Sequence, residues 1–137
     1  MTPKELVALA LEARTHAYVP YSHFAVGSAL LTAGGRIYQG CNIENAGYTP
    51  TICAERTAFF KAVYDGVRDF SAIAVVGGPE DGPAAALCAP CGVCRQVMRE
   101  FCGEDFPVYL GRADGGYLET TLGKLLPYGF TKSDLGK

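Results

Sequence analysis

The sequence predicts a single α/β domain, residues 1–137, in which helices cover one β-sheet. Its length of 137 residues suits one domain. Apolar residues make up 49% and charged residues 19%, which is typical of a globular protein with a buried core. Along the chain, apolar patterns follow the order helix, strands, helix, strand, helix, strands, and this alternation indicates one sheet with helices packed on it.

The N-terminal part is expected to form a helix followed by a β-hairpin. Residues 3–18 match a helix, because a Thr-x-x-Glu capping box begins at Thr2 and a proline follows it. The apolar run of residues 24–32 predicts a buried strand. Gly34-Gly35 is a hairpin signal that leads into a second strand at residues 36–38.

The middle of the chain reads as loop, helix and strand. Residues 42–51 carry Asn, Gly and Pro and are expected to be mostly loop. A second helix should begin within residues 51–53 and run to about Tyr64, ended by the Asp-Gly pair that follows. Residues 71–76 predict a central strand, which the Gly-Gly-Pro of residues 77–79 is expected to close.

The C-terminal part contributes the last helix and two short strands. A loop at residues 80–90 precedes a helix over about residues 91–101. Residues 107–110 and 117–121 predict late strands, and the tail, residues 125–137, is too short to form a domain.

Charge and targeting signals narrow the possible partners. The net charge is −2 and no basic stripe is present, which disfavours polymeric nucleic acid as a partner. No apolar run approaches the roughly 20 residues that cross a bilayer. The N-terminus lacks the pattern of a secretory signal. We therefore expect a cytoplasmic protein with no membrane partner, whose cysteines are thiols, metal ligands or catalytic groups rather than disulfides.

Three of the cysteines have the spacing of metal ligands. Cys91 and Cys94 form a Cys-x-x-Cys pair at one expected helix start, and Cys53 lies at another. Free N–H groups at helix N-termini stabilise thiolates, so two such ends could present three sulfurs to one ion. Three protein ligands leave the fourth tetrahedral position open to water, which is the arrangement of a catalytic zinc site. Glu55 and Pro90 complete the three-cysteine form of the zinc deaminase signature, Cys-x-Glu and Pro-Cys-x-x-Cys.

Other interpretations of the cysteines remain open at this point. Taken alone, the Cys-x-x-Cys pair could be a redox pair or a chance spacing. Cys88 extends the pair to Cys-x-x-Cys-x-x-Cys, so a closed site with four cysteines and no catalysis is an alternative. The proline before Cys91 favours Cys91 and Cys94. Cys41 and Cys102 are expected to be small buried apolar groups.

The signature predicts hydrolytic deamination of a cytosine-type ring. Zinc makes hydroxide available near neutral pH, and the hydroxide attacks C4 of the ring. Glu55 is not a ligand in this interpretation: it takes the proton of the water, protonates N3, and later delivers a proton to the departing ammonia. Three thiolates leave zinc with a net negative charge, so a cation should compensate. Arg56 is the best-placed candidate and Arg95 the second.

Five blocks of the sequence resemble the small, homotetrameric, zinc-dependent cytidine deaminases. They are residues 21–30, 40–45, 51–56, 90–96 and 125–130. The resemblance implies a three-layer cytidine deaminase-like fold with a mixed five-stranded sheet flanked by helices. It also implies one Zn²⁺ per subunit, a homotetramer with shared active sites, and conversion of cytidine and 2′-deoxycytidine to the uridines plus ammonia in pyrimidine salvage.

The same resemblance implies roles for the residues of the substrate site. Asn42 and Glu44 would bind the ribose hydroxyls, Phe24 would flank the base, and Ala54 would contact the pyrimidine through its backbone. Phe130, and with it Tyr48, would reach the site of a neighbouring subunit.

The sequence departs from the family pattern at two places, and three other functions are still possible on the sequence alone. Ser28 stands where alanine is usual, which is expected to be harmless, and residues 80–89 form a slightly long loop. The rivals are a deaminase of blasticidin S type, a non-enzymatic zinc module that uses Cys88, and an editing deaminase of RNA or DNA. The pair Asn42 and Glu44 and the Leu-Leu-Pro tail motif favour cytidine over blasticidin S.

Overall fold

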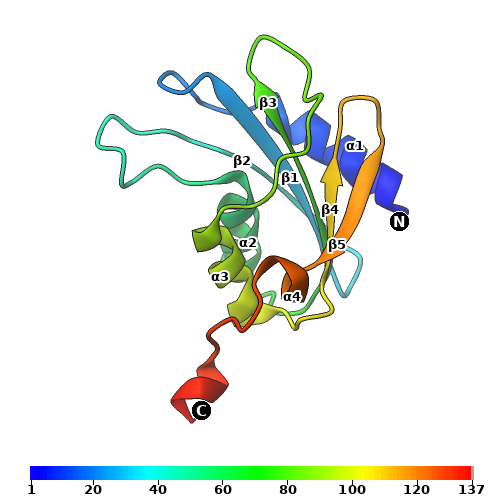
Figure 1. Cartoon of the computed structure of the whole chain (residues 1–137), viewed down its shortest axis with the longest axis vertical. Helices are drawn as coiled ribbons and strands as arrows, with labels where there is room; N and C mark the ends of the chain where they lie inside the picture. Colours follow the sequence, from blue (N-terminus) through cyan, green and yellow to red (C-terminus); the bar gives the residue numbers. More distant parts are fainter. Residues whose placement is uncertain (137) are drawn as a thin grey trace.

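A mixed five-stranded sheet forms the middle layer of the structure, a computed structural model that describes residues 1–136 (Figure 1). The strand order is β2-β1-β3-β4-β5. Only β3 and β4 run parallel, and the other neighbours are antiparallel. The elements are, in chain order, α1 (Pro3–Arg14), β1 (Phe24–Thr32), β2 (Ile37–Cys41), α2 (Ala54–Tyr64), β3 (Phe70–Pro79), α3 (Gly92–Phe101), β4 (Pro107–Gly111), β5 (Tyr117–Thr121), α4 (Leu122–Leu125) and the 3₁₀ helix η1 (Lys132–Leu135).

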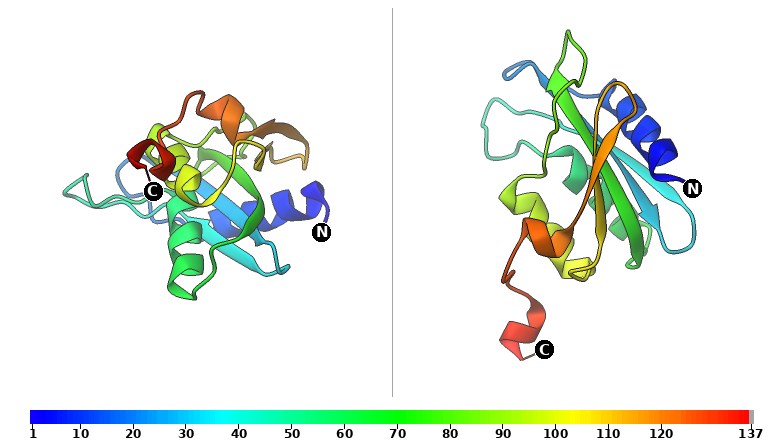
Figure 2. Two further views of the ribbon diagram at one scale, coloured as in Figure 1. Left: turned by 90° about the horizontal axis from the view of Figure 1, so that it is seen from below. Right: turned by 45° about the vertical axis from the view of Figure 1, so that its right-hand side comes forward.

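Helices cover both faces of this sheet, which confirms the predicted three layers. Helix α1 lies on one face, and α2 and α3 lie on the other (Figures 1 and 2). Alternate residues of a strand point to opposite faces. Accordingly, Ile73 and Val75 of β3 join the core beneath α2 and α3, whereas Ala74 and Val76 join the core beneath α1.

The first helix is shorter than the sequence predicts. It ends at Arg14, so the expectation of a helix to Tyr18 is wrong. The backbone of Tyr18 pairs instead with the loop after β2, because its N–H donates to Asn42 O (3.0 Å) and its carbonyl accepts from Glu44 N (2.9 Å). The helix therefore ends at Arg14, although the apolar spacing continues beyond it, because the following backbone pairs with a distant loop.

The central strand β3 is longer than the sequence predicts. Gly77, Gly78 and Pro79 were expected to close it, but they continue the strand and pair with Val26, Ala25 and Phe24 of β1. A Cβ on Gly77 would lie 2.7 Å from the Cys88 sulfur, and one on Gly78 would lie 2.9 Å from Ala84 Cα. The glycines thus let the loop before α3 pack on the end of the strand.

The chain ends in α4, whose Leu122 is fully buried, and in a last turn that extends away from the sheet (Figure 1). Gln96 of α3 donates to the carbonyl of Phe130 (2.8 Å) and so ties the tail to the helix. None of the helices within residues 1–136 is long and apolar enough to span a membrane.

Candidate metal site

Three cysteines converge where two helices begin. Cys53 is the N-cap residue of α2 and Cys91 that of α3, and neither side chain caps its own helix by a hydrogen bond. Cys94 follows in the first turn of α3 and is buried. Both helix starts lie where the sequence predicts them. The sulfurs are therefore free to face one another beside two sets of unpaired helix N–H groups.

The spacing of the three sulfurs fits one tetrahedral zinc ion. The Cys53 and Cys91 sulfurs are 3.7 Å apart, and those of Cys91 and Cys94 are 3.5 Å apart. All three lie within 4.8 Å of one another. Zinc–sulfur bonds of about 2.3 Å at a tetrahedral angle separate two sulfurs by about 3.8 Å. The donor set and the distances thus suit zinc without rearrangement.

Within residues 1–136, the sulfur cluster consists of Cys53, Cys91 and Cys94, and Cys88 is not part of it. Its thiol packs against Gly77, and burial raises its pKa to about 11, with the nearby charges of Glu55 and Cys53 contributing. Its sulfur therefore lies outside the set of donor atoms that one ion could bind. The arrangement therefore favours three cysteine ligands over the closed four-cysteine alternative.

Glu55 is a buried carboxyl group in the first turn of α2. It is 3% exposed, and its Oε1 has no hydrogen-bond partner among the described residues. Burial raises the pKa of this carboxyl to about 7, and the negative Cys53 thiolate contributes to the rise. A carboxyl with such a pKa can both take and give a proton near neutral pH, as general acid–base catalysis requires.

Arg56 is the cation beside the sulfurs. Its Nη2 lies 3.2 Å from the Cys53 sulfur. The neighbouring Cys94 thiol lowers the pKa of Cys53, and Arg56 acts in the same direction. Arg95, the second candidate, donates instead to the carbonyls of Pro90 (2.7 Å) and Leu125 (2.6 Å). Arg95 therefore braces the segment before Cys91 rather than a thiolate.

Asn42 and Glu44 both hold the segment that enters β1. Asn42 Oδ1 accepts from Val26 N and its Nδ2 donates to Phe24 O, each at 2.9 Å. The Glu44 carboxylate accepts from the N–H groups of residues 21 and 22 at 3.0 Å and from the Ser22 hydroxyl. The Ser22 hydroxyl is the main reason why the pKa of Glu44 is lowered. Both side chains are thus held in place by backbone contacts.

The remaining substrate-site candidates differ in exposure. Ala54 is fully buried, whereas Phe24 is 42%, Phe130 55% and Tyr48 75% exposed. Tyr48 and Glu44 line a hollow of about 440 Å³, where Tyr48 lies edge-on to Tyr21 with ring centroids 6.4 Å apart. The structure therefore brings Glu44 and Tyr48 together, and it leaves Phe130 on the exposed tail.

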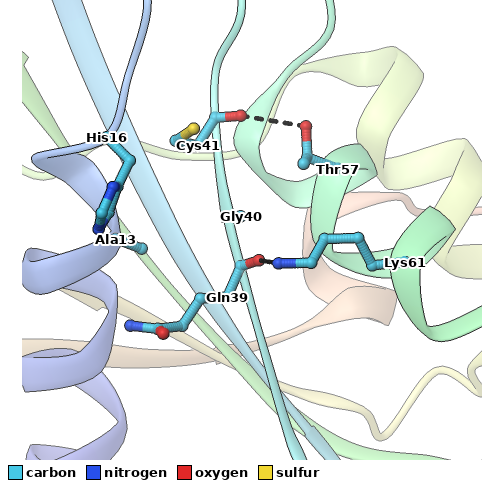
Figure 3. Close-up of a pocket in the computed structure, with 7 residues that line it drawn as sticks. All are labelled: Ala13, His16, Gln39, Gly40, Cys41, Thr57 and Lys61. Atoms are coloured by element: carbon cyan, nitrogen blue, oxygen red, sulfur yellow. Dashed lines mark hydrogen bonds between the residues drawn. The ribbon is translucent and has the colours of Figure 1, made fainter.

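A separate pocket lies beside the edge strand β2 and contains none of the three clustered cysteines. Figure 3 shows its lining residues: Ala13, His16, Gln39, Gly40, Cys41, Thr57 and Lys61. Cys41 is only partly buried, so the expectation of a buried apolar group is wrong for it, and it holds for Cys102. His16 lies here, and His23 pairs with Glu80 (2.9 Å), so neither histidine reaches the cluster.

Sequence reasoning missed one polar contact at this site. The Ser28 hydroxyl donates to the carbonyl of Ala54 (2.8 Å), the residue between Cys53 and Glu55. A serine within an otherwise apolar strand was the available signal, and its partner is far away in the sequence.

Known proteins match this chain over nearly its whole length. The family model described as the cytidine and deoxycytidylate deaminase zinc-binding region matches residues 1–110. A cytidine deaminase of Sporosarcina psychrophila is 57% identical over 135 residues, which are 98% of this chain and 96% of that protein. One of Halalkalibacterium halodurans is 50% identical over 135 residues, which are 98% of each.

Solved structures and a second type of deaminase complete the comparison. The crystal structure of cytidine deaminase from Burkholderia pseudomallei is 48% identical and matches with a TM-score of 0.85, over 95% of this chain and 100% of that chain. A blasticidin-S deaminase of Bacillus cereus is 33% identical over 132 residues, which are 94% of this chain and 92% of that protein.

Proposed function

Because this chain belongs to the family of cytidine and deoxycytidylate deaminases with a zinc-binding region, we propose that it hydrolyses cytidine and 2′-deoxycytidine. The products are uridine and 2′-deoxyuridine, with ammonia released. The observation that carries this proposal is the buried Glu55 carboxyl, which lies two residues after a cysteine of the three-sulfur cluster. The higher identity to cytidine deaminases, 57% against 33%, favours cytidine over blasticidin S.

Cys53, Cys91 and Cys94 would hold one zinc ion per subunit, as the distances between their sulfurs support. When bound, zinc lowers the pKa of a water molecule enough to supply hydroxide near neutral pH. The guanidinium of Arg56 would offset part of the negative charge of the three thiolates through its contact with Cys53. A less negative site binds hydroxide and other electron-rich ligands more readily.

Glu55 would move every proton of the reaction. Its raised pKa lets it accept a proton from the attacking water and pass it to N3 of the ring. It then transfers the second water proton to the amino group, which leaves as ammonia when the C4–N bond breaks. One carboxyl suffices because these transfers occur one after another. Its buried Oε1, which has no hydrogen-bond partner within residues 1–136, is free to contact the substrate.

The substrate site would be completed by residues around β1 and the loop after β2. In this proposal Asn42 and Glu44 bind the ribose hydroxyls, Phe24 flanks the base, and the Ala54 backbone contacts the pyrimidine. The support is the network that ties Asn42 and Glu44 to residues 21–26 and so presents them next to Phe24. The kinetics of the two variants Asn42→Ala and Glu44→Gln, measured separately, would test this assignment. Each variant should have a raised KM for cytidine.

We also propose a homotetramer with shared active sites, in which Phe130 and Tyr48 reach a neighbouring subunit. Large apolar side chains are exposed on α2 and on the tail, including Phe60 (47%), Tyr64 (90%) and Phe130 (55%). Light scattering should give a mass near four times that of one chain. Mixing Glu55→Gln with Phe130→Ala subunits should restore part of the activity, because some sites then combine intact residues from two chains.

We propose that the protein acts in pyrimidine salvage in the reducing cytoplasm, which the free thiols among the described residues support. We further propose that residues 1–137 act as one domain. The tie between Gln96 and Phe130 supports this, because it joins the tail to the body.

The decisive experiment follows the ultraviolet absorbance of cytidine and of blasticidin S with purified protein whose zinc content is known. Cytidine should be the better substrate, with one zinc per subunit. Glu55→Gln should lower kcat by about 10²–10⁴-fold while zinc is retained. The matched control is Glu12→Gln on the exposed surface of α1. Wild-type turnover by Glu55→Gln would remove Glu55 from its assigned role.

A further inference from the structure

Ser28 places a hydroxyl group in the fully buried middle of the sheet. Its side chain is 0% exposed, and it is one of three buried polar or charged side chains among residues 1–136, with Thr32 and Glu55. The hydroxyl donates to the carbonyl of Ala54 at 2.8 Å. Ala54 is the first residue of α2 and lies between Cys53 and Glu55. The contact therefore joins the sheet to the turn that carries a ligand and the proton-transfer group.

The first turn of α2 rests directly on the sheet at this point. A Cβ on Gly40 would lie 2.2 Å from Ala54 O and 2.9 Å from the Ser28 hydroxyl, so the glycine makes room for both. Farther along α2, Thr57 donates to the Cys41 carbonyl (3.0 Å), and Figure 3 shows this contact between two residues that line a pocket. Of these polar ties, the one from Ser28 is fully buried, where water cannot replace it.

The two halves of the cluster are anchored independently. The α3 half is held by Arg95, which donates to the carbonyl just before Cys91 and to the carbonyl of Leu125. The α2 half is held by Ser28 above Gly40. A shift of α2 therefore changes the 3.7 Å distance between the Cys53 and Cys91 sulfurs directly.

We propose that Ser28 is a positioning residue of the metal site. Its hydroxyl fixes the first turn of α2 on the sheet and thereby places the Cys53 sulfur and the Glu55 carboxyl relative to the cysteines of α3. This inference rests on the proposed zinc deaminase function. It differs from the expectation that serine in place of alanine is harmless here, because that expectation considered size alone and not the hydrogen bond of the hydroxyl.

The test compares Ser28→Ala with Thr32→Val, which removes another buried hydroxyl from the same strand. Thr32 is 3% exposed and its hydroxyl accepts from Arg36 N (3.0 Å), at the hairpin end of β1. Zinc affinity is measured by competition with a chromogenic chelator, alongside kcat, KM and Tm. Ser28→Ala should weaken zinc binding about tenfold and lower kcat about tenfold, with a smaller change in KM. Thr32→Val should lower Tm and leave zinc affinity and kcat within about twofold of wild type.

The outcomes separate this inference from the proposed function. If Ser28→Ala keeps zinc affinity and kcat within about twofold, or changes them no more than Thr32→Val does, the inference is overturned. If the wild type binds zinc but does not deaminate cytidine, the proposed function fails, and the chelator comparison still decides the role of Ser28. The Ala54 carbonyl keeps its helical partner in Ser28→Ala, which favours folding. Should that variant not fold, Ser28→Cys replaces the hydroxyl with a slightly larger and weaker donor, and it is judged by the same two measurements.

Discussion

Gly40→Ala tests whether the contact between the sheet and α2 controls the metal site. The added Cβ would lie 2.2 Å from Ala54 O and 2.7 Å from Ala58 N. Ordinary contacts begin at 3.4 Å, so either the first turn of α2 retreats by about 1.2 Å or β2 bends away. The neighbouring atoms belong to the backbone and cannot rotate aside. Overpacking of this kind costs about 1–3 kcal/mol of stability.

The same displacement moves the functional groups, because Cys53 and Glu55 flank Ala54. A misplacement of about 1 Å can lower the rate of an enzyme about 100-fold. We therefore expect Gly40→Ala to lower kcat for cytidine by roughly that factor and to weaken zinc binding in a chelator competition assay. Thermal unfolding would show the accompanying loss of stability.

Gly27→Ala is the matched control on the opposite face of the sheet. Its Cβ would lie 2.1 Å from Ala10 O and 2.4 Å from Arg14 N, so the steric conflict is as severe, but it displaces α1. No proposed site residue lies on α1. Gly27→Ala should lower Tm to a similar extent, with zinc affinity and kcat of the folded protein within about threefold of wild type. Wild-type kcat and zinc affinity in Gly40→Ala would refute the reasoning.

Three further predictions follow from the same contacts. Arg56→Gln removes the charged hydrogen bond to Cys53, which is worth about 1.5–3 kcal/mol. Zinc binding should therefore weaken about 10- to 100-fold in chelator competition. An unchanged zinc affinity would contradict this prediction. In metal-free protein, the pKa of Glu55 is raised to about 7 from 4.5, so the folded state binds the proton more tightly and stability should fall by about 3 kcal/mol as pH rises from 4.5 to 7. Glu55→Gln should abolish that part of the pH dependence of Tm. If the variant keeps the Tm profile of the wild type, the pKa of Glu55 is not raised in the folded protein. Phe59 is fully buried against three other phenylalanine rings. Phe59→Ala should therefore lower the free energy of unfolding in urea by about 3–5 kcal/mol, and a loss below about 1 kcal/mol would place Phe59 outside the core.

The element boundaries show where sequence patterns stop being sufficient. The sequence placed the start of α2 at residues 51–53 and that of α3 near Cys91, because capping and apolar period are local properties. It did not place the end of α1 or of β3. Those ends depend on the pairing of Tyr18 with the loop after β2 and on the packing of Cys88 over Gly77, which join segments far apart in the chain.

The sequence by itself determined the chemistry available to this protein. Cys53 and Glu55, and likewise Cys91 and Cys94, lie within single helix turns, so their spacing already states which groups can act together. Only the tertiary structure decided that the two turns meet, that Arg56 rather than Arg95 contacts a thiolate, and that Cys88 stays outside. The physical reason is range. A helix turn is set by bonds between near neighbours, whereas the distance between two turns is set by how closely each helix packs on the sheet.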